Sequence, residues 1–321
     1  MVAGRYISPE VITNNQTKLK LGFPSNMNQA LKKTVKLTPY DLVSGVVRLV
    51  SLPEVCIRVN EMLEDPRISA PEIGKIISQD PGLTARLLKI VNSAFYGFPS
   101  RIETVSRAVT VIGLRELRGL VLAASAVEAF SKIPNDVLNM VRFWRHSVYC
   151  GVVAQLLAER CNVLHSERLF VAGLLHDIGK LILSHRMPNE MREVANRMKV
   201  EQRPDYEIER EIFGFDHSDV GGELITVWQM PKTLAEAVRY HHNPHEADHS
   251  IMDVCLIHIA NGLTIIAEQG LEMEGTHEAI SPYAWQTTNL DPDSMDEIFI
   301  EAGNRFSEAL ESILPRGYRP Y

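Results

Sequence analysis

The spacing of apolar residues constrains this chain more than any other feature of its sequence. From about residue 40, apolar side chains recur three, four and seven positions apart, as at Val43, Val46, Val47 and Val50. That spacing is the period of an amphipathic helix. Nowhere do five or more residues alternate between apolar and polar, and the glycine-rich GxGxxG and GxxxxGK[ST] patterns are absent. We therefore predict an all-α fold.

Capping and turn residues divide the first half of the chain into short helices. Ser69 and Glu72 have the spacing of a capping box, and Asp80 precedes a second helix as its cap. Gly113 separates the next helix from a long apolar one that ends near Phe130. We expect these helices to form a subdomain over residues 40–135.

A second group of helices is predicted from about residue 136 to residue 270. We expect its elements over residues 136–161, 166–185, 189–200, 205–213, 217–228, 232–240 and 251–268. The stretch DPDS at 291–294 then caps a last amphipathic helix. The prediction is a bundle of two packed helical subdomains, with an arm over residues 1–39 and a C-terminal extension over residues 271–321.

Charge is distributed unevenly along the chain. The sequence holds 33 Lys and Arg against 40 Asp and Glu, a net charge of −7. Its first forty residues hold six basic residues and one acidic residue, a charge of +5, which leaves −12 for the rest. We interpret residues 1–39 as a separate basic arm. The acidic remainder opposes attraction to a phosphate backbone, so we expect no nucleic-acid partner.

Cysteine usage and hydropathy predict a cytoplasmic protein. The four cysteines lie far apart with no CxxC pair, which is typical of reduced, buried thiols. The longest apolar stretch, Leu120 to Val127, has eight residues, whereas a transmembrane helix needs about 20. The N-terminal residues do not have the pattern of a secretory signal. We expect no membrane span.

The second half of the sequence contains a set of histidines at the predicted edges of helices, one of them followed directly by an aspartate. The set is His146, His176, Asp177, His217, His241 and His242. Imidazole and carboxylate groups are the ligands that borderline transition metals take. The ammonium group of Lys180, one turn after Asp177, is a candidate contact for a phosphate oxygen. For each histidine alone, the alternative is a core side chain bonded to a carbonyl.

Several short motifs carry a resemblance to a known family. They are Leu52-Pro53, DPGLT at 80–84, Asn92-Ser93, the segment 102–113, and GLLHDIGK at 173–180. In these motifs the chain resembles the bacterial HDOD domain over about residues 40–243. The resemblance implies an all-helical regulatory module, related to the HD phosphohydrolases and to the HD-GYP cyclic-di-GMP phosphodiesterases. Such modules are regarded as signalling or scaffold proteins without demonstrated catalysis, so signalling proteins are the implied partners.

The resemblance also implies a ligand set. His146 matches the first ligand of the HD pattern, His176 and Asp177 match the pair that names it, and Lys180 matches the associated lysine. The ligands that dinuclear members add are matched by His217, His241 and His242.

Two positions depart from that pattern. Asn261 stands where the terminal aspartate ligand is expected, and Arg142 stands where a glutamate precedes the first histidine by one turn. Asparagine is a neutral, weaker ligand and arginine is none. The GYP signature after the paired histidines is also missing, which disfavours hydrolysis of cyclic-di-GMP.

Two functions are compatible with these residues. The first is a non-catalytic signalling module that keeps the histidine cluster either as a structural metal site, with one or two ions, or as a remnant of such a site. We expect Fe, Mn, Ni or Zn, because imidazole nitrogen outnumbers oxygen among the ligands. The alternative is a metal-dependent phosphohydrolase that acts on a nucleotide or another phosphoester. Asn261 and Arg142 favour the first, whereas the complete histidine set and Lys180 favour the second. Either function predicts that the six ligand candidates converge in one pocket.

Overall fold

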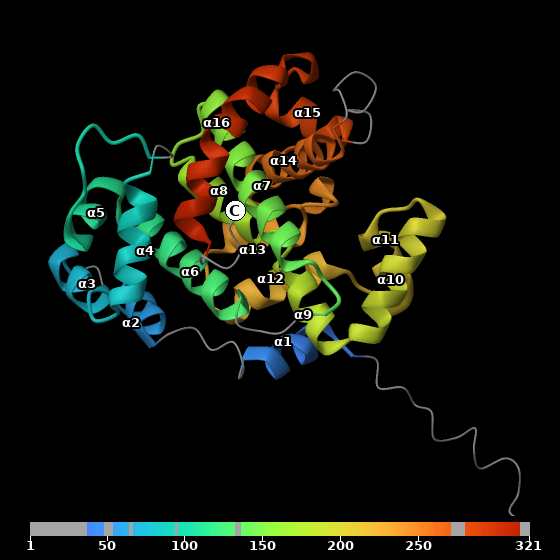
Figure 1. The fold of residues 1–321 in the computed structure, drawn as a ribbon, viewed down its shortest axis with the longest axis horizontal. Helices are drawn as coiled ribbons and strands as arrows, with labels where there is room; N and C mark the ends of the chain where they lie inside the picture. The colour runs from blue at the N-terminus through green and yellow to red at the C-terminus, as the bar shows by residue number, and fades with distance from the viewer. Residues whose placement is uncertain are drawn as a thin grey trace, which may run out of the picture. The chain divides into compact units, whose positions relative to one another are not determined.

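Helices make up the described part of the protein (Figure 1). The computed structural model describes residues 37–47, 54–63, 67–93, 96–131, 136–270 and 280–314. These ranges contain α-helices and short 3₁₀ turns and no β-strand, which confirms the all-α prediction. Residues 1–36, most of the predicted basic arm, lie outside the described residues.

The helices follow one another with short connections. The first are α1 (Pro39–Val47), α2 (Glu54–Leu63), α3 (Ala70–Ile77), α4 (Pro81–Val91), α5 (Val105–Ile112) and α6 (Leu114–Ser131). The next are α7 (Met140–Arg160), α8 (Glu167–Leu175), α9 (Ile178–Arg186), α10 (Pro188–Glu201), α11 (Asp205–Phe213), α12 (His217–Val227) and α13 (Lys232–Arg239). The last are η1 (Pro244–Glu246), α14 (Ile251–Gln269), α15 (Pro282–Thr288), η3 (Pro292–Ser294) and α16 (Asp296–Ile313).

The predicted caps in the first half are present. The carboxylate of Asp80 accepts the backbone N–H of Leu83 at 2.9 Å, and the carboxylate of Glu72 accepts that of Ser69 at 2.8 Å. Both bonds satisfy N–H groups that the first turn of a helix leaves without partners. Helix α5 ends before Gly113, whose φ of 89° belongs to the left-handed region.

Two predicted elements differ from the structure. Helix α7 begins at Met140, later than residue 136, because the side chain of Asn139 caps it by accepting the N–H of Arg142 at 3.0 Å. The single element expected over residues 166–185 is two helices, α8 and α9. The break between them falls at His176 and Asp177.

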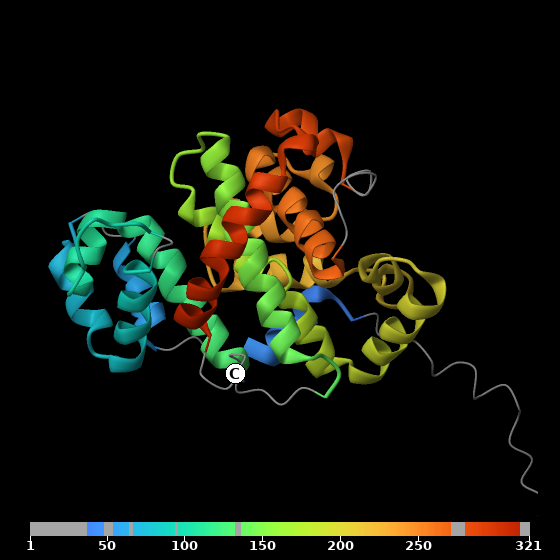
Figure 2. The same ribbon diagram turned by 45° about the horizontal axis from the view of Figure 1, so that its top comes forward.

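Helix α7 lies at the centre of the second group of helices and packs against α8, α14 and α16 (Figure 2). Its Trp144 is fully buried. Helix α12 packs against α13 and α9. Helix α6 contacts α2, α4 and α5 and also α8, so it connects the first helices to the second group.

Helix α1 packs against α9 and α12, which come much later in the sequence. Its Leu42, Val43 and Val46 are buried. The guanidinium group of Arg186, the last residue of α9, lies over Gly45, where an added Cβ would be 2.8 Å from it. The chain from residue 37 onward forms one unit by its contacts, and the boundaries at residues 39, 135 and 270 stay predictions.

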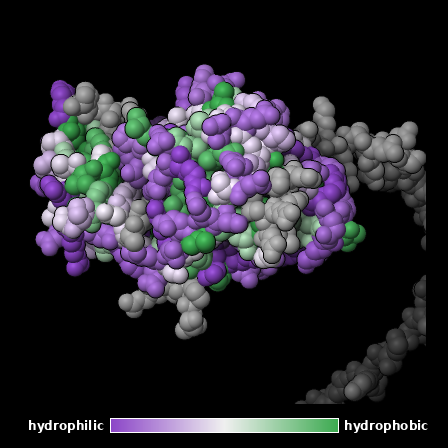
Figure 3. All heavy atoms as spheres, turned by 90° about the horizontal axis from the view of Figure 1, so that it is seen from above, coloured by the Kyte–Doolittle hydropathy of each residue, from purple (hydrophilic) through white to green (hydrophobic). Residues whose placement is uncertain are grey.

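Helix α14 is long and apolar enough to cross a membrane by length and composition, although no membrane span was expected from the sequence. In the structure 61% of the apolar window of this helix is buried against the rest of the protein, which is typical of a core helix. On the face that Figure 3 shows, hydrophobic residues gather at the left end and hydrophilic residues cover most of the remainder. The cytoplasmic location stays a prediction.

Candidate metal centre

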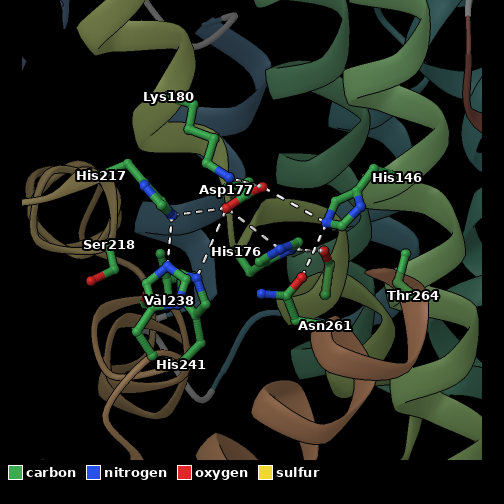
Figure 4. Close-up of polar contacts among 12 residues, drawn as sticks. His146, His176, Asp177, Lys180, His217, Ser218, Val238, His241, Asn261 and Thr264 are labelled. Carbon is green, nitrogen blue, oxygen red and sulfur yellow. Dashed lines mark hydrogen bonds and ion pairs between the residues drawn. The ribbon is translucent and has the colours of Figure 1, made fainter. Parts of the chain in front are cut away.

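Polar side chains from several helices meet at one point in the second group (Figure 4). They come from α7, from the break between α8 and α9, from the start of α12, from the turn after α13, and from α14. They are His146, His176, Asp177, His217, His241, His242 and Asn261. The structure thus brings together all six predicted ligands and the asparagine at the position of the missing aspartate. Their binding of a metal stays a prediction.

The break between α8 and α9 places Asp177 in the middle of this cluster. His176 ends α8 and Asp177 is the residue immediately before α9. Helix α9 then passes very close to α12, because a Cβ added at Gly179 would lie only 1.9 Å from the carbonyl oxygen of His217. Glycine at this position therefore permits the approach that leaves Nε2 of His217 3.0 Å from Oδ1 of Asp177.

The buried histidine rings are held by hydrogen bonds from Nδ1. Nδ1 of His176 donates to the carbonyl of Gly173, and Nδ1 of His241 donates to the carbonyl of Val238, each at 2.7 Å. A carbonyl only accepts, so each Nδ1 carries the proton and each Nε2 has a free lone pair. Metal-binding histidines are characteristically fixed in this way.

A buried glutamate holds the ring of His217 in the same manner. Oε2 of Glu209 lies 2.7 Å from Nδ1 of His217 and also accepts the backbone N–H of that residue at 2.8 Å. Both side chains are fully buried. A carboxylate that bonds the outer nitrogen of an imidazole raises the basicity of the inner one and fixes its direction.

The nitrogens of these rings surround one oxygen of Asp177. Oδ1 lies 3.0 Å from Nε2 of His217, 3.5 Å from Nε2 of His176 and 3.9 Å from Nε2 of His241. Nε2 of His242 lies 2.8 Å from Nε2 of His217. Nitrogen atoms from three separate segments of the chain, each able to bind a cation, therefore lie around one buried carboxylate.

His146 has partners at both ring nitrogens. Its Nδ1 lies 3.2 Å from Oε1 of Glu268, and its Nε2 lies 3.2 Å from Oδ1 of Asn261. Arg142, which stands at the position of the expected glutamate, is mostly exposed and lies 3.6 Å from Glu268. Glu268 thus brings a carboxylate to His146 from α14, although it contacts the outer nitrogen and not the centre of the cluster.

Lys180 is bound by two carboxylates. Its Nζ lies 2.8 Å from Oδ2 of Asp177 and 2.8 Å from Oδ2 of Asp205. Burial lowers the pKa of Lys180, but these two carboxylates raise it by more, so the group stays charged. Contact with a phosphate stays a prediction for a lysine whose charge is already balanced in this way.

Burial and nearby charges set the protonation of the rings. Burial lowers the pKa of His176 to about 4. Burial, together with the rings of His176 and His217, lowers the pKa of His241 well below its usual value. Burial also lowers the pKa of His217, but Glu209 and Asp177 together raise it well above the usual value. The cluster thus supplies neutral imidazoles at one side and favours a positive charge between Glu209 and Asp177.

Sequence reasoning missed three acidic residues that support the cluster. Asp205 and Glu209 lie one turn apart on α11, and Glu268 lies near the end of α14. The spacing of the first two on one helix face was the available signal, but acidic residues at that spacing are common on solvated helices. What distinguishes Glu209 is complete burial, and burial is visible only in three dimensions.

Buried atoms without hydrogen bonds test whether the cluster suits a metal ion. Within the described residues, Nε2 of His176 and Nε2 of His241 have no hydrogen-bond partner, and both side chains are 0% exposed. A buried polar atom left in this state costs about 1–3 kcal/mol. A transition-metal ion, which accepts imidazole lone pairs, would remove that cost. The residues present therefore fit such an ion.

Comparison with known proteins identifies a family. The chain matches the family model of the HDOD domain over residues 49–244. An uncharacterised protein of Treponema pallidum (strain Nichols) is 25% identical over 238 residues, which cover 73% of this chain and 45% of that protein. The chain therefore spans less than half the length of this curated relative.

Solved structures share the fold. An HDOD domain protein of unknown function from Geobacter sulfurreducens has a TM-score of 0.65 at 23% identity, over 86% of this chain and 99% of that chain. A candidate signal transduction protein from Marinobacter aquaeolei has a TM-score of 0.64 at 22% identity, over 84% and 60%. A candidate phosphohydrolase from Shewanella amazonensis has a TM-score of 0.61 at 20% identity, over 83% and 97%. At these identities the likeness shows the fold.

Proposed function

This chain belongs to the HDOD family, and we propose that it is a non-catalytic regulatory module that carries a resident transition metal and acts through signalling proteins. The observation that carries this proposal is the set of buried imidazole nitrogens directed at Asp177 without hydrogen-bond partners of their own. Polar atoms are rarely buried in this state unless they serve a bound group. The acidic charge of residues 41–321 supports protein rather than nucleic-acid partners.

The donor set supports a borderline transition metal over Ca²⁺ or Mg²⁺. Four or five imidazole nitrogens and one carboxylate face the centre of the cluster. Ca²⁺ and Mg²⁺ take oxygen ligands, whereas imidazole nitrogen is a ligand of divalent transition metals such as Fe, Ni and Zn. We propose Fe, Mn, Ni or Zn as the resident ion.

Several contacts favour a structural or sensory role over catalysis. Lys180 is bound by Asp177 and Asp205, so little of its charge is left for a phosphate. Four carboxylates stand in or beside the cluster, on Asp177, Asp205, Glu209 and Glu268. Such a site attracts a cation and repels an anionic phosphoester.

The alternative is a metal-dependent phosphohydrolase that acts on a nucleotide or another phosphoester. The specific observation in its favour is the histidine set, which a catalytic metal ion would need as ligands. A bound divalent ion would supply Lewis-acid chemistry toward a phosphoester. In that function His176, Asp177 and the other histidines would hold the ion, and Lys180 would contact the phosphate after release from Asp205.

Metal analysis combined with a hydrolysis screen tests both functions. Full-length protein purified without chelator should contain one of the four transition metals, and the ion should be absent from a His176→Ala variant. Nucleotides and cyclic dinucleotides, offered with Mn²⁺ or Fe²⁺, should not be hydrolysed. Turnover by the unmodified protein that disappears in His176→Ala would establish the phosphohydrolase. Turnover that appears only in Asn261→Asp would support the non-catalytic function and identify the lost ligand as its cause.

A further inference from the structure

On one side of the cluster the polar atoms pair with one another. We call this the amide side, formed by His146, Asn261, Glu268, Lys180 and Oδ2 of Asp177. Both ring nitrogens of His146 lie 3.2 Å from a side-chain oxygen. Both nitrogens of this ring therefore already have hydrogen-bond partners among the described residues. The carboxylate oxygen nearest this ring, Oδ2 of Asp177, is bonded to Lys180 at 2.8 Å.

The opposite side contains the atoms that lack such partners. We call it the histidine-rich side, formed by His176, His217, His241, His242 and Oδ1 of Asp177. Two of its nitrogens, Nε2 of His176 and of His241, have no hydrogen bond with the described residues. Nε2 of His217 and Nε2 of His242 lie 2.8 Å apart, and two facing ring nitrogens can share only one proton between them.

Charge distinguishes the two sides as well. On the amide side, the ammonium group of Lys180 shares Oδ2 of Asp177 with His146, whose Nε2 lies 3.8 Å from that oxygen. A cation beside His146 would therefore lie close to an existing positive charge. A carboxylate stands behind one ring on each side, Glu209 at 2.7 Å from Nδ1 of His217 and Glu268 at 3.2 Å from Nδ1 of His146, so the difference in charge comes from Lys180.

We infer that this chain holds a single transition-metal ion, on the histidine-rich side, and that His146 closes the pocket through hydrogen bonds instead of binding the ion. The inference rests on the metal site proposed above and specifies its ligands. It departs from the sequence prediction at His146. Asn261 is central to it, because a neutral amide at this position bonds the ring of His146 and supplies no negative charge for a second ion.

Titration with Co²⁺ tests the inference on the full-length protein after dialysis against a chelator. Co²⁺ accepts imidazole ligands, and its visible absorption reports their number. Elemental analysis should give about one Co²⁺ per chain, the content expected for one nitrogen-rich site. The variant His146→Gln should keep this content, with a Kd within about tenfold of the original, the smaller end of losses for residues outside the ligand shell.

The matched change on the histidine-rich side is His241→Gln. It should raise the Kd for Co²⁺ by at least about 100-fold, the upper end of losses even for outer partners of a metal site. His241 is fully buried, so its variant must show a cooperative thermal transition to be compared. His242→Gln replaces a partly exposed ring of the same side, and it should weaken binding in the same way if the first variant does not fold.

The variant Asn261→Asp tests the amide side directly. A carboxylate at this position and the ring of His146 could together bind a second ion, and the content should rise to about two Co²⁺ per chain. An unchanged content would show that the amide is not what excludes an ion, which counts against the inference.

The possible failures are distinguishable. If the unmodified protein binds no Co²⁺, the proposed metal site itself is wrong. If it binds Co²⁺ but His146→Gln abolishes binding while His241→Gln retains it, the metal site stands and the placement of the ion is overturned. Two ions of similar affinity in the unmodified protein would also overturn the inference.

Discussion

The helices before residue 132 and those after residue 135 are built alike but bury different side chains. Among the described residues of α2 to α6 and their connections, the buried polar side chains are serines, Ser93 and Ser125. The second group buries charged and titratable ones, among them Asp177, Glu209 and His217. All eleven histidines of the sequence also lie at or after His146.

The buried side chains of the first group are those of a structural scaffold, whereas those of the second group include the candidate site. Removing an ion from water costs several kcal/mol, and that cost persists only where partners or a function offset it. The first group satisfies its few buried hydroxyls locally, as when Ser125 donates to the carbonyl of Val121 at 2.7 Å. The second group maintains a buried cluster in which Nε2 of His176 and Nε2 of His241 lack hydrogen-bond partners. Changes of the same kind in the two groups should therefore have different consequences.

The largest difference is expected from adding one methyl group to a packed glycine. Gly179→Ala would place a Cβ 1.9 Å from a backbone oxygen of α12, and we expect a loss of at least about 3 kcal/mol of unfolding free energy, the upper end for overpacking. Gly74→Ala in the first group would place a Cβ 2.2 Å from the rotatable hydroxyl of Ser106 and 2.9 Å from its backbone nitrogen, so its nearest backbone contact is less severe. It should cost less and leave Co²⁺ binding intact. Urea unfolding with Co²⁺ titration measures both, and equal losses would contradict the comparison.

Acid should destabilise the second group first. The pKa of His176 is about 4 in the folded protein against 6.5 for an unperturbed side chain. Between these values the unfolded chain binds more protons, so stability falls as the pH drops from 6.5 toward 4. The contribution of this group is on the order of 3 kcal/mol.

The matching variant for this pH dependence is His176→Gln in the metal-free protein. Its unfolding free energy should fall less steeply than that of the unmodified protein over the same range. His217, whose pKa is shifted in the opposite direction, contributes with the opposite sign in both proteins. Parallel pH profiles from thermal unfolding would show that His176 does not carry the effect.

Metal addition should stabilise the second group alone. An ion that binds only the folded state, at a concentration 100 times its Kd, adds about 2.7 kcal/mol to the unfolding free energy. Hydrogen exchange should show the gain in α9 and α12, which carry Asp177 and His217 into the cluster. Amides of α3 to α5 serve as the internal control. Equal protection in both groups would mean that the ion acts on the whole chain.

The smallest difference is expected from removing one helix cap in each group. Asp80→Ala removes a bond to the N–H of Leu83 and should cost about 1 kcal/mol without altering the Kd for Co²⁺. Asp216 accepts the N–H groups of Ser218 and Asp219 at the start of α12. Asp216→Ala should cost at least as much and should also weaken Co²⁺ binding, because that turn holds His217. Calorimetry and titration together distinguish the two variants.

Much of the helical layout could be predicted from local signals. The cap at Asp80, the break at Gly113 and the helix over 205–213 depend on neighbouring residues, and the structure contains all three. The sequence did not predict the break at His176, because the apolar pattern continues from α8 into α9 and the break itself contains no glycine or proline. The candidate ligands His176 and Asp177 thus lie where periodicity alone predicts an unbroken helix.

The clustering of the candidate ligands was predictable from the sequence, but the residues that support them were not. Histidines are few and chemically distinctive, so their clustering was visible in the sequence and in its family resemblance. Glu209 and Glu268 resemble ordinary surface residues in a chain with many acidic side chains. Only the packing of α11 beside α12 shows that Glu209 orients a ring. The two sides of the cluster depend on which oxygen faces which nitrogen, and sequence spacing does not determine this.

The position of α1 has a consequence for how the protein is made. Its apolar face, with Leu42, Val43 and Val46, is covered by α9 and α12. A ribosome adds about 5–20 residues per second, so Val46 is synthesised roughly 10–30 s before His217 and the rest of α12 that buries it. During that interval the apolar face of α1 lacks the helices that cover it in the folded protein. Such exposed apolar surface promotes aggregation unless a chaperone or a transient contact covers it. Fast synthesis or a tag before α1 should therefore influence the soluble yield more than changes near the C-terminus.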